Sequence, residues 1–159
     1  MILKNVLSIG KNGHRKMDTR KQIESWFPNI IGKKFTYFEP ENKFEFNCLA
    51  FSLNMNVWIW TNENWPKDIP SNLGAISFKL LFEKENYKIS NLSDHEIGYE
   101  KIAIYVKNSN PTHVAKQNSN IWQSKVGNFI IEHELEWLCG ETTDAYGEVI
   151  LIMKRKINS

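Results

Sequence analysis

The fold is decided by the stretch from Glu100 to Val126, which reads EKIAIYVKNSNPTHVAKQNSNIWQSKV. Apolar and polar residues alternate along it with the period of two that is typical of half-buried strands. We predict strands over residues 100–106, 112–117 and 121–126, separated by segments rich in Asn, Ser and Pro. Short connections of this kind join antiparallel neighbours. The stretch therefore predicts an antiparallel meander.

Caps, breakers and periodicity predict the remaining elements. Asp18 is a good cap for a helix that Pro28 stops, and Gly140 is a good end for the last helix. The predicted helices cover residues 19–26, 48–55, 71–86 and 130–138, and the other strands cover 34–38, 43–46 and 148–154. Helices come first and strands follow, so we expect the α+β class, with helices packed on a small, mostly antiparallel sheet.

Length and composition indicate one domain. A chain of 159 residues with 42% hydrophobic and 13% aromatic residues buries a core of its own. We expect residues 1–16 to form a loosely ordered N-terminal segment and residues 17–159 to form the single domain. Lys and Arg number 20 against 18 Asp and Glu, spread along the whole chain, so no nucleic-acid partner is expected.

The sequence also bears on the compartment. Its two cysteines cannot form the disulfide framework of a small secreted domain. The N-terminus lacks the apolar core and cleavage site of a signal peptide, and no run approaches the ~18 apolar residues of a membrane span. We expect a cytoplasmic protein that does not enter a membrane, with export by a signal-independent route left open.

Cys48 is the first candidate for chemistry. It follows the N-cap residue Asn47 at the start of a predicted apolar helix. A thiol at a helix N-terminus is biased toward thiolate by the helix dipole and by unpaired backbone N–H groups. His113, on a predicted strand, is the candidate base. The pair predicts nucleophilic attack on an amide or thioester carbonyl, and it requires no cofactor.

Several polar residues are candidates to support this pair. Gln123 and Ser124 point to opposite faces of their strand, and we favour Gln123 as the residue that orients the His113 ring. Gln117 is the alternative. The backbone N–H of Cys48 and the side-chain amide of Asn47 are candidate oxyanion donors. If Asn47 caps the helix, its oxyanion role fails.

Other interpretations stay open. One alternative is that Cys48 only fills the core as a small apolar residue. Cys139 and His133 lie six residues apart on one predicted helix, a spacing at which side chains do not meet. No Cys or His spacing is typical of a metal site, so none is predicted. The six tryptophans form either an aromatic core, which we favour, or a stacking platform for bases or sugars.

Six motifs carry a resemblance to a known group. They include Phe46–Phe51 (FNCLAF), WIW at 58–60, WP at 65–66, PTHVAKQ at 111–117 and WQSKVG at 122–127. The chain resembles an uncharacterised bacterial domain family with Asn-Cys-x-Ala-Trp/Phe and Pro-Thr-His-x-Ala-x-Gln motifs. That family is similar to papain-like cysteine hydrolases of the CHAP and NlpC/P60 type. The resemblance implies a papain-like fold with Cys48 as nucleophile and His113 as base, although Thr112-His113 stands where those enzymes have Gly-His.

Two functions are therefore expected. The first is a papain-like cysteine hydrolase or acyltransferase, such as a peptidase, amidase or deamidase, acting on a protein or peptide substrate. The second is a non-catalytic binding module of the same fold, an immunity or effector-partner protein. In that case the loop around Trp65 would be exposed and would contact the partner.

Overall fold

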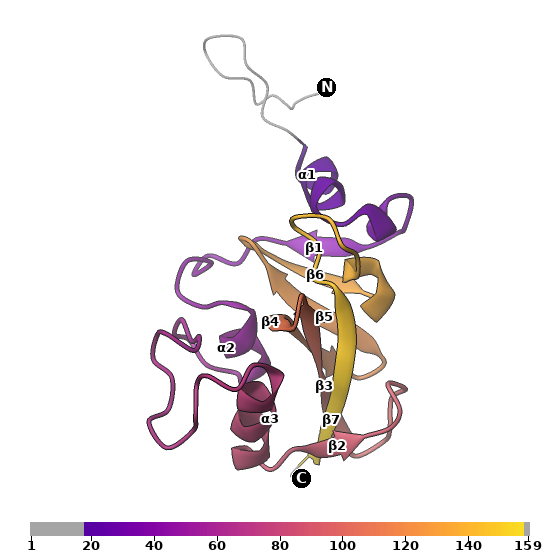
Figure 1. The fold of residues 1–159 in the computed structure, drawn as a ribbon. Coiled ribbons are helices and arrows are strands. Elements are labelled where there is room, and N and C mark those ends of the chain that lie inside the picture. The colour runs from indigo at the N-terminus through magenta and orange to yellow at the C-terminus, as the bar shows by residue number, and fades with distance from the viewer. Residues whose placement is uncertain (1–17, 158–159) are drawn as a thin grey trace.

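The computed structural model describes residues 18–157 and contains one seven-stranded antiparallel sheet (Figure 1). The strand order is β1-β6-β5-β4-β3-β7-β2. The strands are β1 (Thr36–Phe38), β2 (Lys88–Ser90), β3 (Tyr99–Lys107), β4 (Asn110–Asn118), β5 (Ile121–Val126), β6 (Phe129–His133) and β7 (Glu148–Lys156). The helices are α1 (Thr19–Trp26), α2 (Cys48–Ser52) and α3 (Ala75–Lys84), with 3-10 turns η1 (Pro28–Ile30) and η2 (Leu135–Leu138). The segment 1–16, for which loose order was expected, lies outside the described residues.

The predicted fold class is wrong in its balance and in its papain-like architecture. The described chain is mostly a large sheet with a few short helices, rather than helices packed on a small sheet. The main error lies at 130–138, which forms β6 and η2 instead of one helix. Ile130 and Ile131 are β-branched and favour a strand. Gly127, with φ of +54°, closes a tight hairpin that pairs Val126 with Phe129.

The meander and the first helix are confirmed. β5 has the predicted bounds, and β3 and β4 extend the predicted strands by one or two residues at each end. α1 also has its predicted bounds, and the Asp18 carboxylate accepts the backbone N–H of Arg20. The predicted strand at 43–46 is a turn instead, α2 ends three residues early, and β2 was not predicted.

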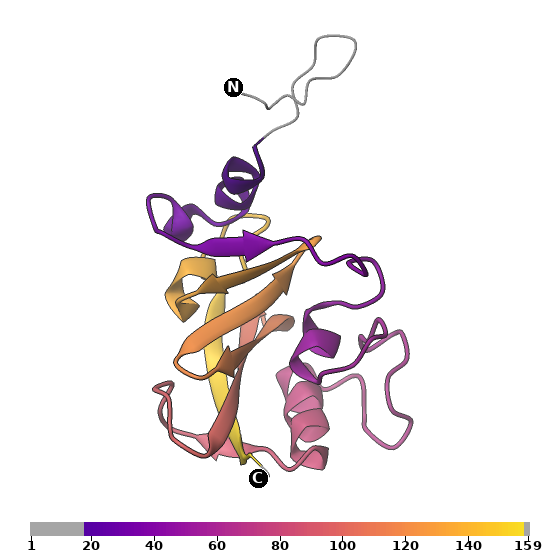
Figure 2. The same cartoon turned by 180° about the vertical axis from the view of Figure 1, so that it is seen from behind.

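The sheet buries a core on each of its faces. Because successive strand residues point to opposite faces, Ile102 and Ile104 of β3 join one cluster and Ala103 and Tyr105 join the other. The first cluster includes residues of α2 and α3, which lie together on one side of the sheet in both views (Figures 1 and 2). The second includes residues of α1, η1 and η2. Helices therefore cover both faces, and α2 lies over the centre of the sheet.

Candidate functional site

α2 takes the place of β5 beside part of β4. The two strands pair from Asn118↔Ile121 to Lys116↔Gln123 and then separate. Val114 lies on β4 two residues before Lys116, where β5 no longer pairs with it. There its backbone N–H bonds the Cys48 sulfur, and its carbonyl accepts the Ser52 hydroxyl at 3.3 Å. Cys48 and Ser52 are four residues apart, so they share one face of α2. The Cys48 thiol therefore sits at the backbone of the residue that follows His113.

Asn47 fixes the start of α2 with its whole carboxamide. Its oxygen accepts the backbone N–H groups of Ala50 and Ile59 at 3.1 and 3.3 Å, and its nitrogen donates to the Ile59 carbonyl at 2.6 Å. The predicted N-cap is confirmed. Its predicted role as an oxyanion donor fails, because the amide nitrogen is already engaged.

The Cys48 thiol is surrounded by groups that favour its anion but is dominated by burial. The residue is partly exposed, yet burial around the sulfur raises its pKa to about 11. The backbone N–H groups of Val114, Leu49 and Cys48 and the charge of Lys125 act in the opposite direction. The thiolate expected at this helix start is therefore not the resting state. Cys48 rests as a neutral thiol.

Lys125, which the sequence did not single out, anchors the segment that enters α2. Its ammonium donates to the carbonyls of Lys43 and Phe46 at 2.8 and 2.9 Å and lies 4.7 Å from the centre of the Phe46 ring. Burial lowers its pKa, and the nearby Cys48 raises it. A lysine in a short strand gives no sequence signal of this role, because most such lysines face solvent.

A chain of hydrogen bonds fixes the His113 ring. His113 Nε2 lies 2.8 Å from the Ser124 hydroxyl, which lies 2.7 Å from His133 Nε2. His133 Nδ1 lies 2.8 Å from the Glu134 carbonyl, an acceptor only, so Nδ1 carries the proton. Burial lowers the pKa of His133 to about 4, so this ring is neutral and its Nε2 accepts the Ser124 hydroxyl. The Ser124 oxygen then accepts the N–H of His113 Nε2.

This assignment leaves His113 Nδ1 as a bare lone pair. The His113 side chain is 1% exposed, and Nδ1 has no hydrogen-bond partner among the described residues. Burial also lowers the pKa of His113 well below its ordinary value. A neutral imidazole with one nitrogen held and the other vacant is the form that a general base requires.

Tyr146 packs against the histidine. Its ring stacks on His113, with centroids 4.1 Å apart and planes at 6°. Burial raises the pKa of Tyr146, and the charges of Cys48 and Asp144 raise it further. Within residues 18–157 no hydrogen bond joins Cys48 to His113. The His113 ring lies against Tyr105 and Tyr146 on the face of the second core cluster, whereas α2 packs with the first cluster.

The orienting contact belongs to Ser124 and not to Gln123. Gln123 donates to the Glu132 carboxylate at 3.3 Å, and Gln117 donates to the Ser93 carbonyl at 2.9 Å. Neither reaches His113. Sequence reasoning also missed His133, because it lies in the predicted helix 130–138 and no pairing of that segment with the strand of Ser124 was expected. The sequence signal that could have found it is a strand pattern after the Gly127 turn, in which Ile131 and His133 share one face.

Two other residues from the sequence lie apart from this site. The Cys139 thiol points to the Leu135 carbonyl at 3.6 Å, so it does not meet His133. Trp65 is partly buried: its indole N–H donates to the Ile69 carbonyl at 2.9 Å, and its ring packs 5.6 Å from Phe78. Trp65 is therefore only partly available as an aromatic contact, while Asn62, Glu63 and Asn64 of the same loop are exposed.

Within residues 18–157 no three His, Cys, Asp or Glu side chains are grouped so that they could hold a metal ion. None of the helices in this range has the length and apolar character needed to cross a bilayer.

Comparisons with known proteins place the chain in a family. Residues 37–154 match the family described as a domain of unknown function, DUF7689. No papain-like or CHAP family supports the resemblance suggested by the motifs. No curated protein and no solved structure matches. Because the match covers well over half of the chain, including α2 and the strands that carry His113, Ser124 and His133, the chain belongs to the DUF7689 family.

Proposed function

We propose that this protein is a cysteine hydrolase or acyltransferase that acts on an amide or thioester bond, with Cys48 as nucleophile and His113 as base. The observation that carries the proposal is the vacant Nδ1 of the buried His113 ring. A buried nitrogen without a partner is costly, and such groups are few in folded proteins. Here the ring is held from its other nitrogen by three consecutive hydrogen bonds.

The reaction follows from the neutral state of both groups. The Cys48 sulfur attacks the substrate carbonyl carbon while its proton passes to His113 Nδ1. The tetrahedral intermediate then collapses, and the same proton goes to the departing amine or thiol, which leaves a thioester on Cys48. Water or an amine attacks this thioester with His113 as base, and Cys48 regains its proton. Ser124 keeps the imidazole in the tautomer that makes Nδ1 basic.

The raised thiol pKa distinguishes this site from one with a preformed ion pair. A neutral thiol is a weak nucleophile, so proton transfer must accompany the attack. The three backbone N–H groups near the sulfur stabilise negative charge once it develops. We therefore expect simple alkylation of Cys48 to be slow below pH 9, whereas acylation by an activated carbonyl compound depends on His113.

Acetylation with p-nitrophenyl acetate tests the proposal. At pH 7.5 we expect one equivalent of p-nitrophenol per chain and an acetyl group on Cys48, located by peptide mass spectrometry. His113→Ala is expected to slow acetylation by about 100-fold or more. Cys139→Ala is the matched control, because Cys139 is also partly exposed with a raised pKa but has the backbone groups of Leu135 and Val149 as its partners in place of a histidine. It is expected to change nothing.

The opposite outcome is equally clear. If Cys48 and Cys139 acetylate at similar rates, or if His113→Ala leaves the Cys48 rate unchanged while the variant remains folded by circular dichroism, the enzyme proposal fails. His113→Gln, which keeps a polar group in the same volume, separates loss of the base from loss of folding.

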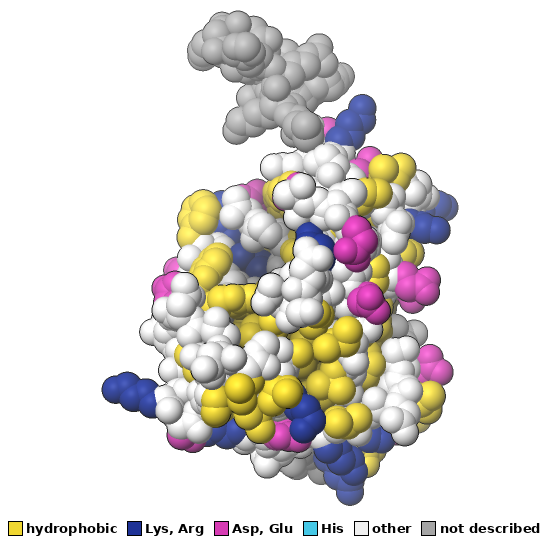
Figure 3. Space-filling model, viewed as in Figure 1, with side chains coloured by type: hydrophobic (Ala, Val, Ile, Leu, Met, Phe, Trp, Pro, Cys, Tyr) yellow, Lys and Arg dark blue, Asp and Glu magenta, His cyan; other side chains and the backbone are white. Residues whose placement is uncertain are grey.

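A second candidate, a non-catalytic binding protein, has one observation in its favour. Apolar side chains gather on the face formed by α3 and β7 (Figure 3). Ile76 of α3 and Ile150 of β7 are 56% and 48% exposed. Apolar patches on a surface often mark contact sites. The acetylation experiment separates the two candidates, because a binding protein modifies both thiols slowly and without dependence on His113.

A further inference from the structure

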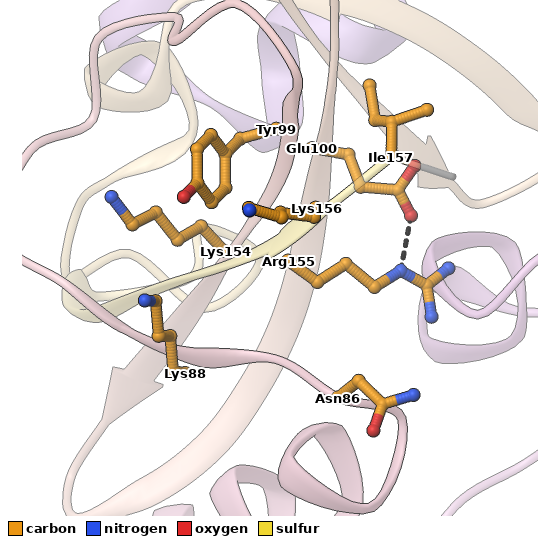
Figure 4. A pocket seen from close by; sticks show the side chains of 8 residues that line it. All are labelled: Asn86, Lys88, Tyr99, Glu100, Lys154, Arg155, Lys156 and Ile157. Atoms are coloured by element: carbon orange, nitrogen blue, oxygen red, sulfur yellow. Dashed lines mark hydrogen bonds and ion pairs between the residues drawn. The ribbon is translucent and has the colours of Figure 1, made fainter. Parts of the chain in front are cut away.

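A basic cavity lies at the sheet edge where β2, β7 and β3 meet. Its volume is about 670 Å³. Four cationic side chains, Lys88, Lys154, Arg155 and Lys156, line it with one carboxylate, that of Glu100 (Figure 4). The whole chain has a formal net charge of only +2. The fold therefore concentrates at one edge a positive charge that the composition does not reveal.

The strand register brings three of these cations onto one face. Lys88 of β2 and Lys154 of β7 are register partners, and Lys156 follows two residues along β7. Partners in an antiparallel pair have Cβ atoms about 5 Å apart, and residues i and i+2 lie about 7 Å apart on the same face. In Figure 4 the three lysines lie on one side of the cavity and Arg155 lies on the other beside Glu100. Like charges placed directly opposite destabilise a sheet.

Acidic partners neutralise only part of this charge. Glu96 is shared between Lys154, at 3.0 Å, and the fully buried Lys101, at 2.8 Å. No acidic side chain pairs with Lys88 or Lys156 within residues 18–157. The three cavity lysines and the buried Lys101 therefore have only one acidic partner among them in the described chain, Glu96.

Arg155 has a different role from the lysines. Its guanidinium bonds the Glu100 carboxylate and the Glu85 carbonyl and lies 4.6 Å from the centre of the Tyr87 ring. Its Nε and one Nη are thus engaged, and the cavity offers no arginine without an acidic partner for two-point binding of a planar carboxylate. Lysine ammonium groups are point charges that bind tetrahedral phosphate oxygens without such a requirement.

We propose that this cavity binds a small molecule carrying two or three linked phosphates, held by Lys88, Lys154 and Lys156. Three lysines on one side of the cavity, with one shared carboxylate, favour a ligand with several negative charges over one with a single charge. The volume lies in the range of small-molecule sites. A cavity of this kind fits a small ligand better than it fits the surface of a macromolecule. The proposal does not depend on the Cys48 chemistry.

Binding of sodium tripolyphosphate to the full chain tests this inference. By isothermal titration calorimetry at 0.15 M ionic strength we expect saturable binding of one equivalent. The double variant Lys88→Gln/Lys156→Gln should weaken binding at least tenfold. The matched control is Lys79→Gln/Lys84→Gln, which removes two charges from α3, where each lysine is paired with an acid. It should bind as the parent chain does.

Three results would overturn the proposal. Equal weakening by both double variants would show an effect of net charge alone. Equal competition by sulfate at the same ionic strength would show general screening in place of a phosphate site. Self-association of the Lys88→Gln/Lys156→Gln variant, with tripolyphosphate binding unchanged, would show that these lysines serve to protect the sheet edge from aggregation.

Discussion

The α2 site and the β2–β7 edge treat ionisable groups in opposite ways. At the candidate functional site, the imidazoles of His113 and His133 are buried, neutral and joined through one hydroxyl. At the edge, lysine side chains line a cavity with few acidic partners. Within one sheet, the degree of burial determines which chemistry the side chains can perform. Burial fixes tautomers and positions for proton transfer, whereas the open edge keeps charge available to attract an ion.

The largest expected effect is the response of the buried side to acid. The pKa of His133 is about 4 in the fold against 6.5 in the unfolded chain, and that of His113 is also lowered. The unfolded chain therefore binds protons first as the pH falls, so the free energy of unfolding drops below pH 6.5. From pH 7 to pH 5 the His133 imidazole contributes a loss of about 2 kcal/mol, and His113 acts in the same direction.

Urea denaturation at pH 7, 6 and 5 measures this loss. His133→Gln should remove its share of the pH dependence while lowering stability at pH 7. A free energy of unfolding that is constant over this range would mean that the two imidazoles are not held neutral, and the contrast between the two regions would disappear.

The next effect concerns the hydroxyl that joins the imidazoles. Ser124→Ala removes two hydrogen bonds at a fully buried position and leaves a nitrogen on each ring without its partner. We expect a loss of about 2–3 kcal/mol in the free energy of unfolding. Ser25→Ala is the control: its hydroxyl bonds the Gln22 carbonyl on the exposed face of α1, and the loss should stay below about 0.5 kcal/mol.

Ser124→Ala also tests the proposed tautomer. Without the hydroxyl, His113 is free to carry its proton on either nitrogen. Acetylation of Cys48 should therefore slow at 25 °C by more than the fraction of unfolded chain accounts for. Equal acetylation rates in Ser124→Ala and the parent chain would remove Ser124 from the positioning of the base.

The smallest effect is expected at the edge. Lys88→Gln/Lys156→Gln removes two charges that have no acidic partner in the described chain, so the free energy of unfolding should change by less than about 0.5 kcal/mol. Chemical denaturation at pH 7 measures this. A loss comparable to that of Ser124→Ala would show that the edge lysines support the fold, which would erase the distinction between the two regions.

Local patterns account for what could be predicted. The alternation in 100–126 identified three adjacent strands, and Asn47 was identified as the cap that starts α2 at Cys48. Both signals are carried by near neighbours in sequence, where spacing and cap chemistry act directly. The error at 130–138 has the same origin, because an apolar run of that length suits a strand or a helix until its partners are known.

The sequence alone determined the antiparallel meander, the capped thiol at Cys48 and a histidine on the neighbouring strand. Only the tertiary structure decided which groups surround them. It separated β4 from β5 so that α2 bonds Val114, placed Ser124 between His113 and His133, and gathered four basic side chains at one edge. The reason is physical: pKa values and hydrogen-bond partners depend on burial and on contacts between strands distant in sequence, which no local pattern encodes.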